Sequence, residues 1–179
     1  MKIIDSPFQD CYILKPQIIE DARGHFFESF NAKRFSDLTG LNVNFVQDNQ
    51  SFSSHGVIRG LHAQVGQYAQ AKLVRVLQGE VLDVVVDGRP ESPTYGKHFS
   101  ILLSAKNKLQ LFIPRGFFHG FSVLSKEAVF FYKCDNYYNK SSERGVFYAD
   151  PFLSIDWQVP DFSRIITEKD LDLPLFNQL

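Results

Sequence analysis

Arg59, Gly60 and His62 lie within one short apolar segment, Gly56 to Gln64 (GVIRGLHAQ). The β-branched residues of this segment are typical of a buried strand, where an unpaired cation costs free energy. Strict alternation along a strand places Arg59 and His62 on opposite faces. Both side chains reach one cavity only if Gly60 breaks the register, as a glycine bulge does. The segment is therefore a candidate site that brings a cation and a base together.

Four other side chains could take part in proton chemistry: Lys72, Asp83, Tyr132 and Asp170. Each also has an ordinary structural explanation: a solvated strand end, a buried acid with a donor, a packed aromatic and a surface acid. Together with His62 they suit proton transfer at a carbon next to a carbonyl. In that chemistry a base removes the proton, a cation stabilises the enolate oxygen, and a phenol returns a proton on the other face.

The five histidines form no H-x-H or H-E-x-x-H pair, the spacings that place two imidazoles on one metal ion. His62 and His119 could still converge with a carboxylate when the chain folds. At this point a site that binds a metal ion remains an alternative to proton transfer without a metal.

The elements that would position these residues are mainly strands, since aromatic residues make up 15% of the chain. Short apolar runs separated by turn residues predict an antiparallel sandwich or barrel. Residues 72–87 predict two strands joined as a hairpin at 78–80, and Asp87 is interpreted as a turn residue. Further strands are expected within 98–104, 109–113, 117–124 and 128–134. A short helix is expected over 31–40, and turns or a helix after residue 161. We predict one domain, 1–179.

The composition excludes several classes of protein. The formal net charge of −1 argues against a nucleic-acid groove or a polybasic membrane patch. The first residues do not form a secretory signal, and no apolar run has transmembrane length. Cys11 and Cys134 lie far apart, which fits free thiols in a reducing compartment, so the cytoplasm is expected. The apolar run LDVVVD, if it forms a sheet edge, predicts a homodimer built by strand pairing.

Five ordered blocks resemble the dTDP-4-dehydrorhamnose 3,5-epimerase family: FVQDNQSFSSHGVIRGLHAQ, AQAKLVRVLQGEVLDVVVDGRPESPTYG, IPRGFFHGFSVLS, YKCDNYYNKSSERG and DPFLSIDW. The resemblance implies a double-stranded β-helix, a jelly roll of the cupin type, with short flanking helices. It also implies a homodimer that needs neither metal nor organic cofactor. The implied substrate is dTDP-4-dehydro-6-deoxy-glucose, whose product serves dTDP-L-rhamnose synthesis. The resemblance thus favours proton transfer without a metal over a metal site.

The resemblance also implies roles for individual residues. His62 would be the base, Asp170 would hold its imidazole, and Asp83 would be a rival or additional partner of that ring. Tyr132 would be the acid, and Lys72 would bind near the enolate oxygen. Arg59 would meet the diphosphate. The remaining substrate contacts implied are Arg23, Glu28, Gln47, Asn49, His119, Tyr138, Glu143 and Lys169. Of these, Arg23 would reach across from a partner subunit, and Tyr138 is a candidate stacking platform.

Two segments depart from the family pattern: Asp87-Gly88-Arg89 replaces a more usual VDIR, and the loop before Lys72 is VGQYAQ. Both lie near loops that would touch the substrate. They leave open an epimerase of one centre, or one for another nucleotide 4-keto-sugar. A 3,4-ketoisomerase, a non-enzymatic sugar-nucleotide-binding jelly roll and a metal-dependent cupin oxygenase are the further alternatives.

Overall fold

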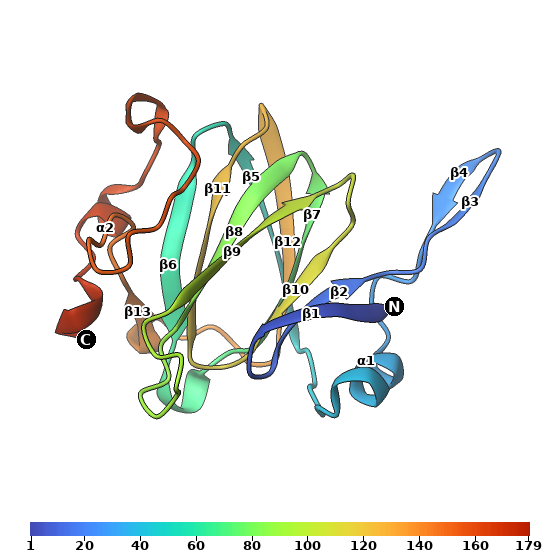
Figure 1. The fold of residues 1–179 in the computed structure, drawn as a ribbon, viewed down its shortest axis with the longest axis horizontal. Coiled ribbons are helices and arrows are strands. Elements are labelled where there is room, and N and C mark those ends of the chain that lie inside the picture. Colours follow the sequence, from blue (N-terminus) through green and yellow to red (C-terminus); the bar gives the residue numbers. More distant parts are fainter.

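Two antiparallel β-sheets face each other in the computed structural model, which describes all 179 residues (Figure 1). The six-stranded sheet has the order β1 (Lys2–Phe8), β2 (Cys11–Lys15), β10 (Gln110–Ile113), β7 (Lys72–Gln78), β12 (Glu127–Cys134) and β5 (Gln47–Ser54). The five-stranded sheet has the order β13 (Glu143–Gly145), β6 (Ile58–Gln64), β11 (Phe117–Val123), β8 (Glu80–Asp87) and β9 (His98–Ser104). The predicted mainly β architecture is confirmed.

Helices are short and lie at the edges of the sheets. The helix α1 (Ala32–Thr39) begins after Asn31, whose side chain accepts the backbone N–H of Arg34, and ends at Gly40, as expected. The C-terminal segment forms turns and one short helix: η3 (Asp161–Ser163), α2 (Glu168–Leu171) and η4 (Phe176–Gln178). Two further 3₁₀ turns are η1 (Gly66–Tyr68) and η2 (Lys140–Ser142). None of the helices is long and apolar enough to cross a bilayer.

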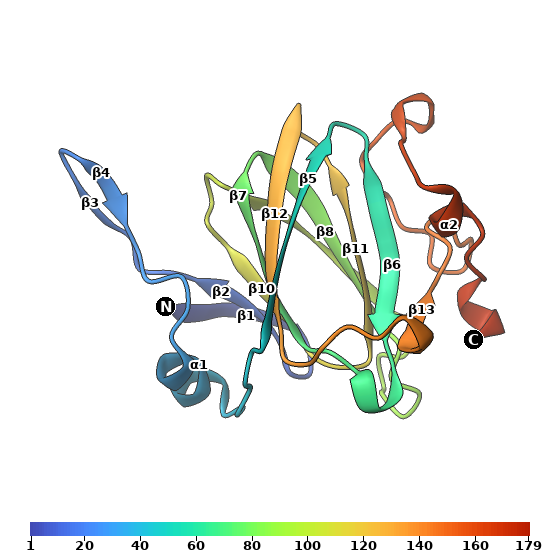
Figure 2. The same ribbon diagram turned by 180° about the vertical axis from the view of Figure 1, so that it is seen from behind.

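A small two-stranded arm, β3 (Ile19–Asp21) and β4 (Gly24–Phe26), projects away from both sheets (Figure 2). Ile19 and Phe26 are exposed on it. An isolated hairpin of this length is marginally stable in water. Every residue of β3 and β4 is exposed, so the arm has little packing within the chain.

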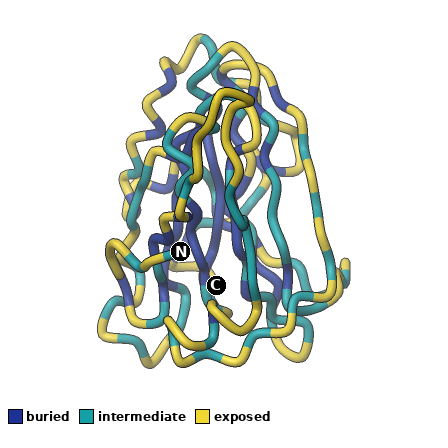
Figure 3. Tube along the Cα trace, turned by 90° about the vertical axis from the view of Figure 1, so that its right-hand side faces the viewer, coloured by how far each residue is buried: buried dark blue, intermediate teal, exposed yellow.

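The core has three apolar clusters in successive layers. The largest lies between the sheets and includes Val76 of β7 and Val85 of β8. A second brings Trp157 of the C-terminal segment together with Val84, on the opposite face of β8. A third lies under α1, around Phe35. The buried residues accordingly follow the strands in the middle of the molecule, while loops and ends are exposed (Figure 3).

The predicted hairpin at residues 78–80 is wrong. β7 pairs with β10 and β12, whereas β8 pairs with β9 and β11, so the chain crosses from one sheet to the other at Gly79. Gly79 has φ 76°, and a Cβ there would collide with the backbone oxygen of Glu127. Because β7 and β8 lie in opposite sheets rather than pair, inward valines of both strands are buried in the same cluster between the sheets.

The expectation that LDVVVD forms an exposed edge is also wrong. β8 has a neighbour on each side, and all but the first of its residues are buried. Strands buried on both faces read as continuous apolar runs, which explains the pattern without a second chain.

Asp87 ends β8 and organises the turn that follows it. Its carboxylate accepts two hydrogen bonds from the guanidinium of Arg89, at 2.9 and 2.8 Å, and one from each hydroxyl of Ser92 and Thr94, both at 2.6 Å. The turn role is confirmed. Burial alone would raise the pKa of Asp87, but these donors outweigh it and lower the pKa to about 2.

We expect Asp87→Asn to lower the free energy of unfolding by about 2 kcal/mol at pH 7, because a pKa held this far below its ordinary value stabilises the folded state. Since the folded pKa lies below the unfolded one, this contribution is present above pH 4 and is lost as the pH falls toward 2. Urea unfolding of both proteins at pH 7 and pH 3 measures it. A difference that does not shrink at pH 3 would contradict the assignment.

Candidate active site

The cavity between the sheets depends on a bulge in β6. His62 lies opposite His119 of β11 and Arg59 lies opposite Phe121, so three steps along β6 span two steps along β11. The extra residue is Gly60, with φ 110°, and a Cβ there would lie 2.6 Å from the carbonyl oxygen of His119. The predicted break in register is confirmed, because Arg59 and His62 both line the same cavity.

Asp170 of α2 accepts two hydrogen bonds from this bulged strand. Its Oδ1 lies 2.8 Å from Nε2 of His62, and its Oδ2 accepts the backbone N–H of Gly60 at 3.3 Å. A bulge frees a backbone donor from the ladder, and here that donor orients the carboxylate. Burial alone would raise the pKa of Asp170, but the hydrogen bonds from His62 and Gly60 outweigh it and hold the pKa below its usual range.

Lys72 and Tyr132 line the same cavity, whose volume is about 420 Å³. They come from β7 and β12, in the sheet opposite the one that carries His62. The Nζ atom of Lys72 lies 5.8 Å from the centre of the Tyr132 ring. Burial lowers the pKa of the Lys72 ammonium and raises the pKa of the Tyr132 phenol. The cavity thus places a base on one wall and a proton-bearing phenol with a cation on the other.

A second histidine–carboxylate pair lies beside the first. Nε2 of His119 lies 2.9 Å from Oδ2 of Asp83, and the side chains are 7% and 0% exposed. The expectation that Asp83 is a partner of His62 is not met, since the carboxylate bonded to His62 is Asp170. Burial lowers the pKa of His119 and raises the pKa of Asp83.

His62 and His119 do not gather a set of metal ligands. No group of three or more His, Cys, Asp and Glu side chains in the chain could hold a metal ion. Each of the two histidines is instead bonded to its own carboxylate.

A second cavity of about 300 Å³ adjoins the first, and its lining includes four of the other predicted substrate contacts: Gln47, Asn49, Tyr138 and Glu143. Glu143 accepts hydrogen bonds from the hydroxyl of Tyr138, at 3.0 Å, and from Nζ of Lys169, at 2.7 Å. Burial alone would raise the pKa of Glu143, but these two donors outweigh it and lower the pKa. The residues that line both cavities are Asn49, His62, Lys72 and Tyr132, and Gln47 lines the second one.

Arg59 lies at the first cavity but is exposed, so its cation is not buried as its apolar surroundings suggested. Its Nε donates to the hydroxyl of Ser53 at 3.1 Å. Its Nη2 donates to the carbonyl oxygen of Phe52 at 3.5 Å. Nη1 has no partner within the chain and is free to meet an anion.

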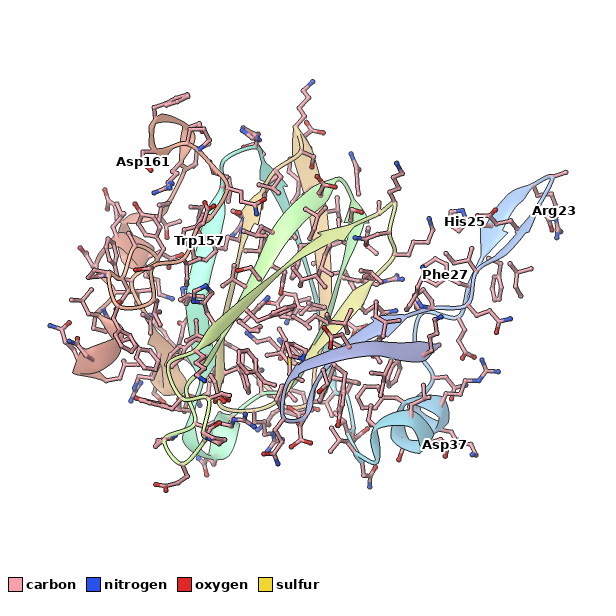
Figure 4. All side chains as sticks on the ribbon, viewed as in Figure 1. Arg23, His25, Phe27, Asp37, Trp157 and Asp161 are labelled. Atoms are coloured by element: carbon pink, nitrogen blue, oxygen red, sulfur yellow. The ribbon has the colours of Figure 1, made fainter.

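Two predicted substrate contacts lie elsewhere. Arg23 occupies the tip of the projecting arm, far from the sheets, and pairs there with Asp21 at 2.6 Å (Figure 4). Glu28 accepts from Asn31 and pairs with Arg34 at 3.3 Å, beside α1. Neither residue lines a cavity that contains His62.

Sequence reasoning missed several lining residues. Gln64 and Gln70 line the second cavity, and they fix the loop after β12 by bonds to the N–H of Asn139, at 2.9 Å, and to the carbonyl of Asn136, at 2.7 Å. Alternation along β6 could have found Gln64, because it follows His62 by two residues. Thr167, Phe121 and Phe130 line the first cavity, the two rings being stacked at 4.3 Å. The two phenylalanines read as ordinary core residues.

Fold and cavity together define an acid–base isomerase built on a jelly roll. A family model described as dTDP-4-dehydrorhamnose 3,5-epimerase matches residues 5–178. The chain belongs to this family, as the resemblance implied.

Solved structures and curated relatives agree. A dTDP-4-dehydrorhamnose 3,5-epimerase from Elizabethkingia anophelis NUHP1 superposes with a TM-score of 0.96 at 56% identity, over 99% of this chain and 97% of that one. The dTDP-6-deoxy-D-glucose-3,5-epimerase of Legionella pneumophila Philadelphia 1, in complex with dTDP-4-keto-L-rhamnose, gives 0.95 at 48%, over 99% and 94%. The Shigella flexneri dTDP-4-dehydrorhamnose 3,5-epimerase is 49% identical over 172 residues, 96% of this chain and 94% of the relative. The cupin-type fold prediction is thereby confirmed.

We expect Gly60→Ala to lower the free energy of unfolding by roughly 3 kcal/mol or more, because its Cβ would meet the backbone of β11. Gly24→Ala is the matched control: Gly24 also has positive φ, 124°, but its Cβ would have no atom within 4 Å. That variant should lose only about 1–2 kcal/mol. Equal losses in urea unfolding would show that the close approach at Gly60 contributes nothing.

Proposed function

We propose that this protein inverts C3 and C5 of dTDP-4-dehydro-6-deoxy-D-glucose through an enolate, giving dTDP-4-dehydro-L-rhamnose for dTDP-L-rhamnose synthesis. The observation that carries the proposal is the cavity in which the His62–Asp170 pair and Tyr132 come from opposite sheets. The 4-keto-sugar bound to the Legionella relative supports the choice of substrate.

The substrate supplies its own activating group. The C4 ketone acidifies the hydrogens on C3 and C5, since both carbons are adjacent to it. His62 is the base that removes each proton. Because Nε2 of His62 faces Asp170, an ionised Asp170 keeps the proton on that nitrogen and leaves Nδ1 free to accept one.

Lys72 stabilises the enolate oxygen that forms at C4. A fixed ammonium in a partly dry cavity interacts with an oxyanion far more strongly than it would in water. Tyr132 returns the proton from the face opposite His62. Its pKa is raised by burial, which keeps the phenol protonated and ready to donate. One base and one acid on opposite faces can invert first one centre and then the other.

The nucleotide occupies the rim and the second cavity. Arg59 meets the diphosphate, for which a planar guanidinium is suited. Tyr138 is a platform on which the nucleobase stacks. Gln47, Asn49, Glu143 and Lys169 complete these contacts, and His119 contacts the sugar in the first cavity.

The active unit is a homodimer. The arm that carries Arg23 leaves its own chain's cavity and exposes Ile19 and Phe26. Arg23, with Glu28 near the base of the arm, contacts the substrate of the partner subunit. The reaction takes place in the cytoplasm, where free thiols such as Cys11 and Cys134 are stable.

The deciding experiment is solvent exchange of the ring protons. The purified protein is incubated in D₂O with dTDP-4-dehydro-6-deoxy-D-glucose, and the sugar is followed by NMR. We expect deuterium at both C3 and C5, with exchange slowed by about 10²- to 10⁴-fold in His62→Ala. Deuterium at one carbon would mean a one-centre epimerase, and deuterium at neither would contradict the proposal. Stoichiometric transition metal in the active protein would instead favour the oxygenase alternative.

Tyr132→Phe separates the two proton transfers. We expect this variant to keep exchanging deuterium into the sugar, because His62 still removes and returns protons on its own face. Formation of the inverted product should fall by about 10²-fold or more. The same NMR spectra report both quantities. A parallel loss of exchange and inversion would show that Tyr132 is needed for proton removal and is not simply the acid.

A further inference from the structure

The Asp83–His119 pair is a buried histidine–carboxylate pair in the cavity wall that the proposed reaction does not use as acid or base. His119 lines the cavity, whereas Asp83 lies behind it, fully buried. Oδ2 of Asp83 meets Nε2 of His119, but Oδ1 has no partner. Oδ1 is the only buried side-chain nitrogen or oxygen atom in the chain without a hydrogen bond.

A purely structural buried carboxylate looks different in this same strand. Asp87, four residues further along β8, uses both oxygens and four side-chain hydrogen bonds. A buried polar atom left without a partner costs free energy. Asp83 is therefore poorly explained as a stabilising group, and its one hydrogen bond directs it to His119.

The ring of His119 has two distinct sides. Nε2 faces Asp83, while Nδ1 makes no hydrogen bond within the chain and is not among the buried unpartnered atoms, so it is accessible from the cavity. Burial raises the pKa of Asp83, and His119 and Lys72 oppose that shift. In its ionised form the carboxylate accepts hydrogen bonds only, and this form favours the tautomer of His119 with the proton on Nε2. Burial also lowers the pKa of His119, which favours the neutral ring.

We propose that Asp83 is a positioning residue that fixes His119 as a neutral Nε2–H tautomer, leaving Nδ1 as an acceptor for a hydroxyl group of the bound sugar. Two histidines on neighbouring strands thus act differently. His62 is partly exposed and bonded to Asp170, and it is the base; His119 is buried and bonded to Asp83, and it orients the substrate. Only the identity of the hydroxyl-bearing ligand rests on the proposed function.

The first test needs no substrate. Histidine-labelled ¹⁵N protein, free of ligand, is examined by long-range ¹H–¹⁵N NMR, which distinguishes protonated from unprotonated ring nitrogens. We expect His119 to carry its proton on Nε2 in the wild type. In Asp83→Leu, which offers no acceptor, the proton should move to Nδ1. Asp87→Asn, which removes the other buried carboxylate of β8, should leave the signals of His119 unchanged.

A wild-type His119 protonated on Nδ1, or on both nitrogens, would overturn the proposal even if Asp83→Leu did not fold. An unchanged tautomer in a folded Asp83→Leu protein would overturn it as well. Because these spectra involve no turnover, they stay informative if the solvent-exchange experiment rejects the epimerase function.

Kinetics then test whether Asp83 acts through His119. Loss of one hydrogen bond to the sugar should raise KM by roughly three- to tenfold in Asp83→Leu. His119→Gln should have a similar effect, and the double variant should be no worse than His119→Gln alone. Effects that multiply in the double variant would show that Asp83 acts independently of His119 and would contradict the proposal.

Discussion

The close approach of β6 to β11 at two glycines is the constraint on which the site depends. A Cβ on Gly60 would lie 2.7 Å from the Cα of Gly120, and a Cβ on Gly120 would lie 2.7 Å from the carbonyl oxygen of Arg59. Only with no side chain at either position can the bulge form at this point. Because of the bulge, the side chains of Arg59 and His62 both line one cavity. The bulge also presents the backbone N–H of Gly60, which donates a hydrogen bond to Asp170.

The cavity also shows how a jelly-roll interior can hold charged groups. The inward positions of β7, β8, β11 and β12 contribute most of the apolar residues between the sheets, and the two buried carboxylates at the cavity, Asp83 and Asp170, are each bonded to a histidine. An unpaired charge in this setting would be costly. Pairing each carboxylate with a histidine lowers that cost.

The parts of the site come from distant points of the chain. Asp170 and Lys169 belong to a four-residue helix near the C-terminus, which reaches His62 because the C-terminal segment packs along β6 and β13 (Figure 1). The packing of Trp157 into the second core cluster anchors this segment. Mechanism and stability are therefore linked, since loosening the C-terminal segment would also withdraw the carboxylate from the base.

The sequence by itself determined the strands from β6 to β12, the helix α1, the reaction type and most of the lining residues. Alternating apolar residues and turn residues report local conformation and burial directly. The GVIRGLHAQ segment even indicated that Gly60 must break the register. Pairing was not determined: the runs on either side of Gly79 look like a hairpin, and LDVVVD looks like an edge. Only the tertiary structure decided that these two strands lie in opposite sheets, that Asp170 is bonded to His62, and that Asp83 is bonded to His119. Those outcomes depend on contacts between residues far apart in the chain, and local patterns carry no information about such distances.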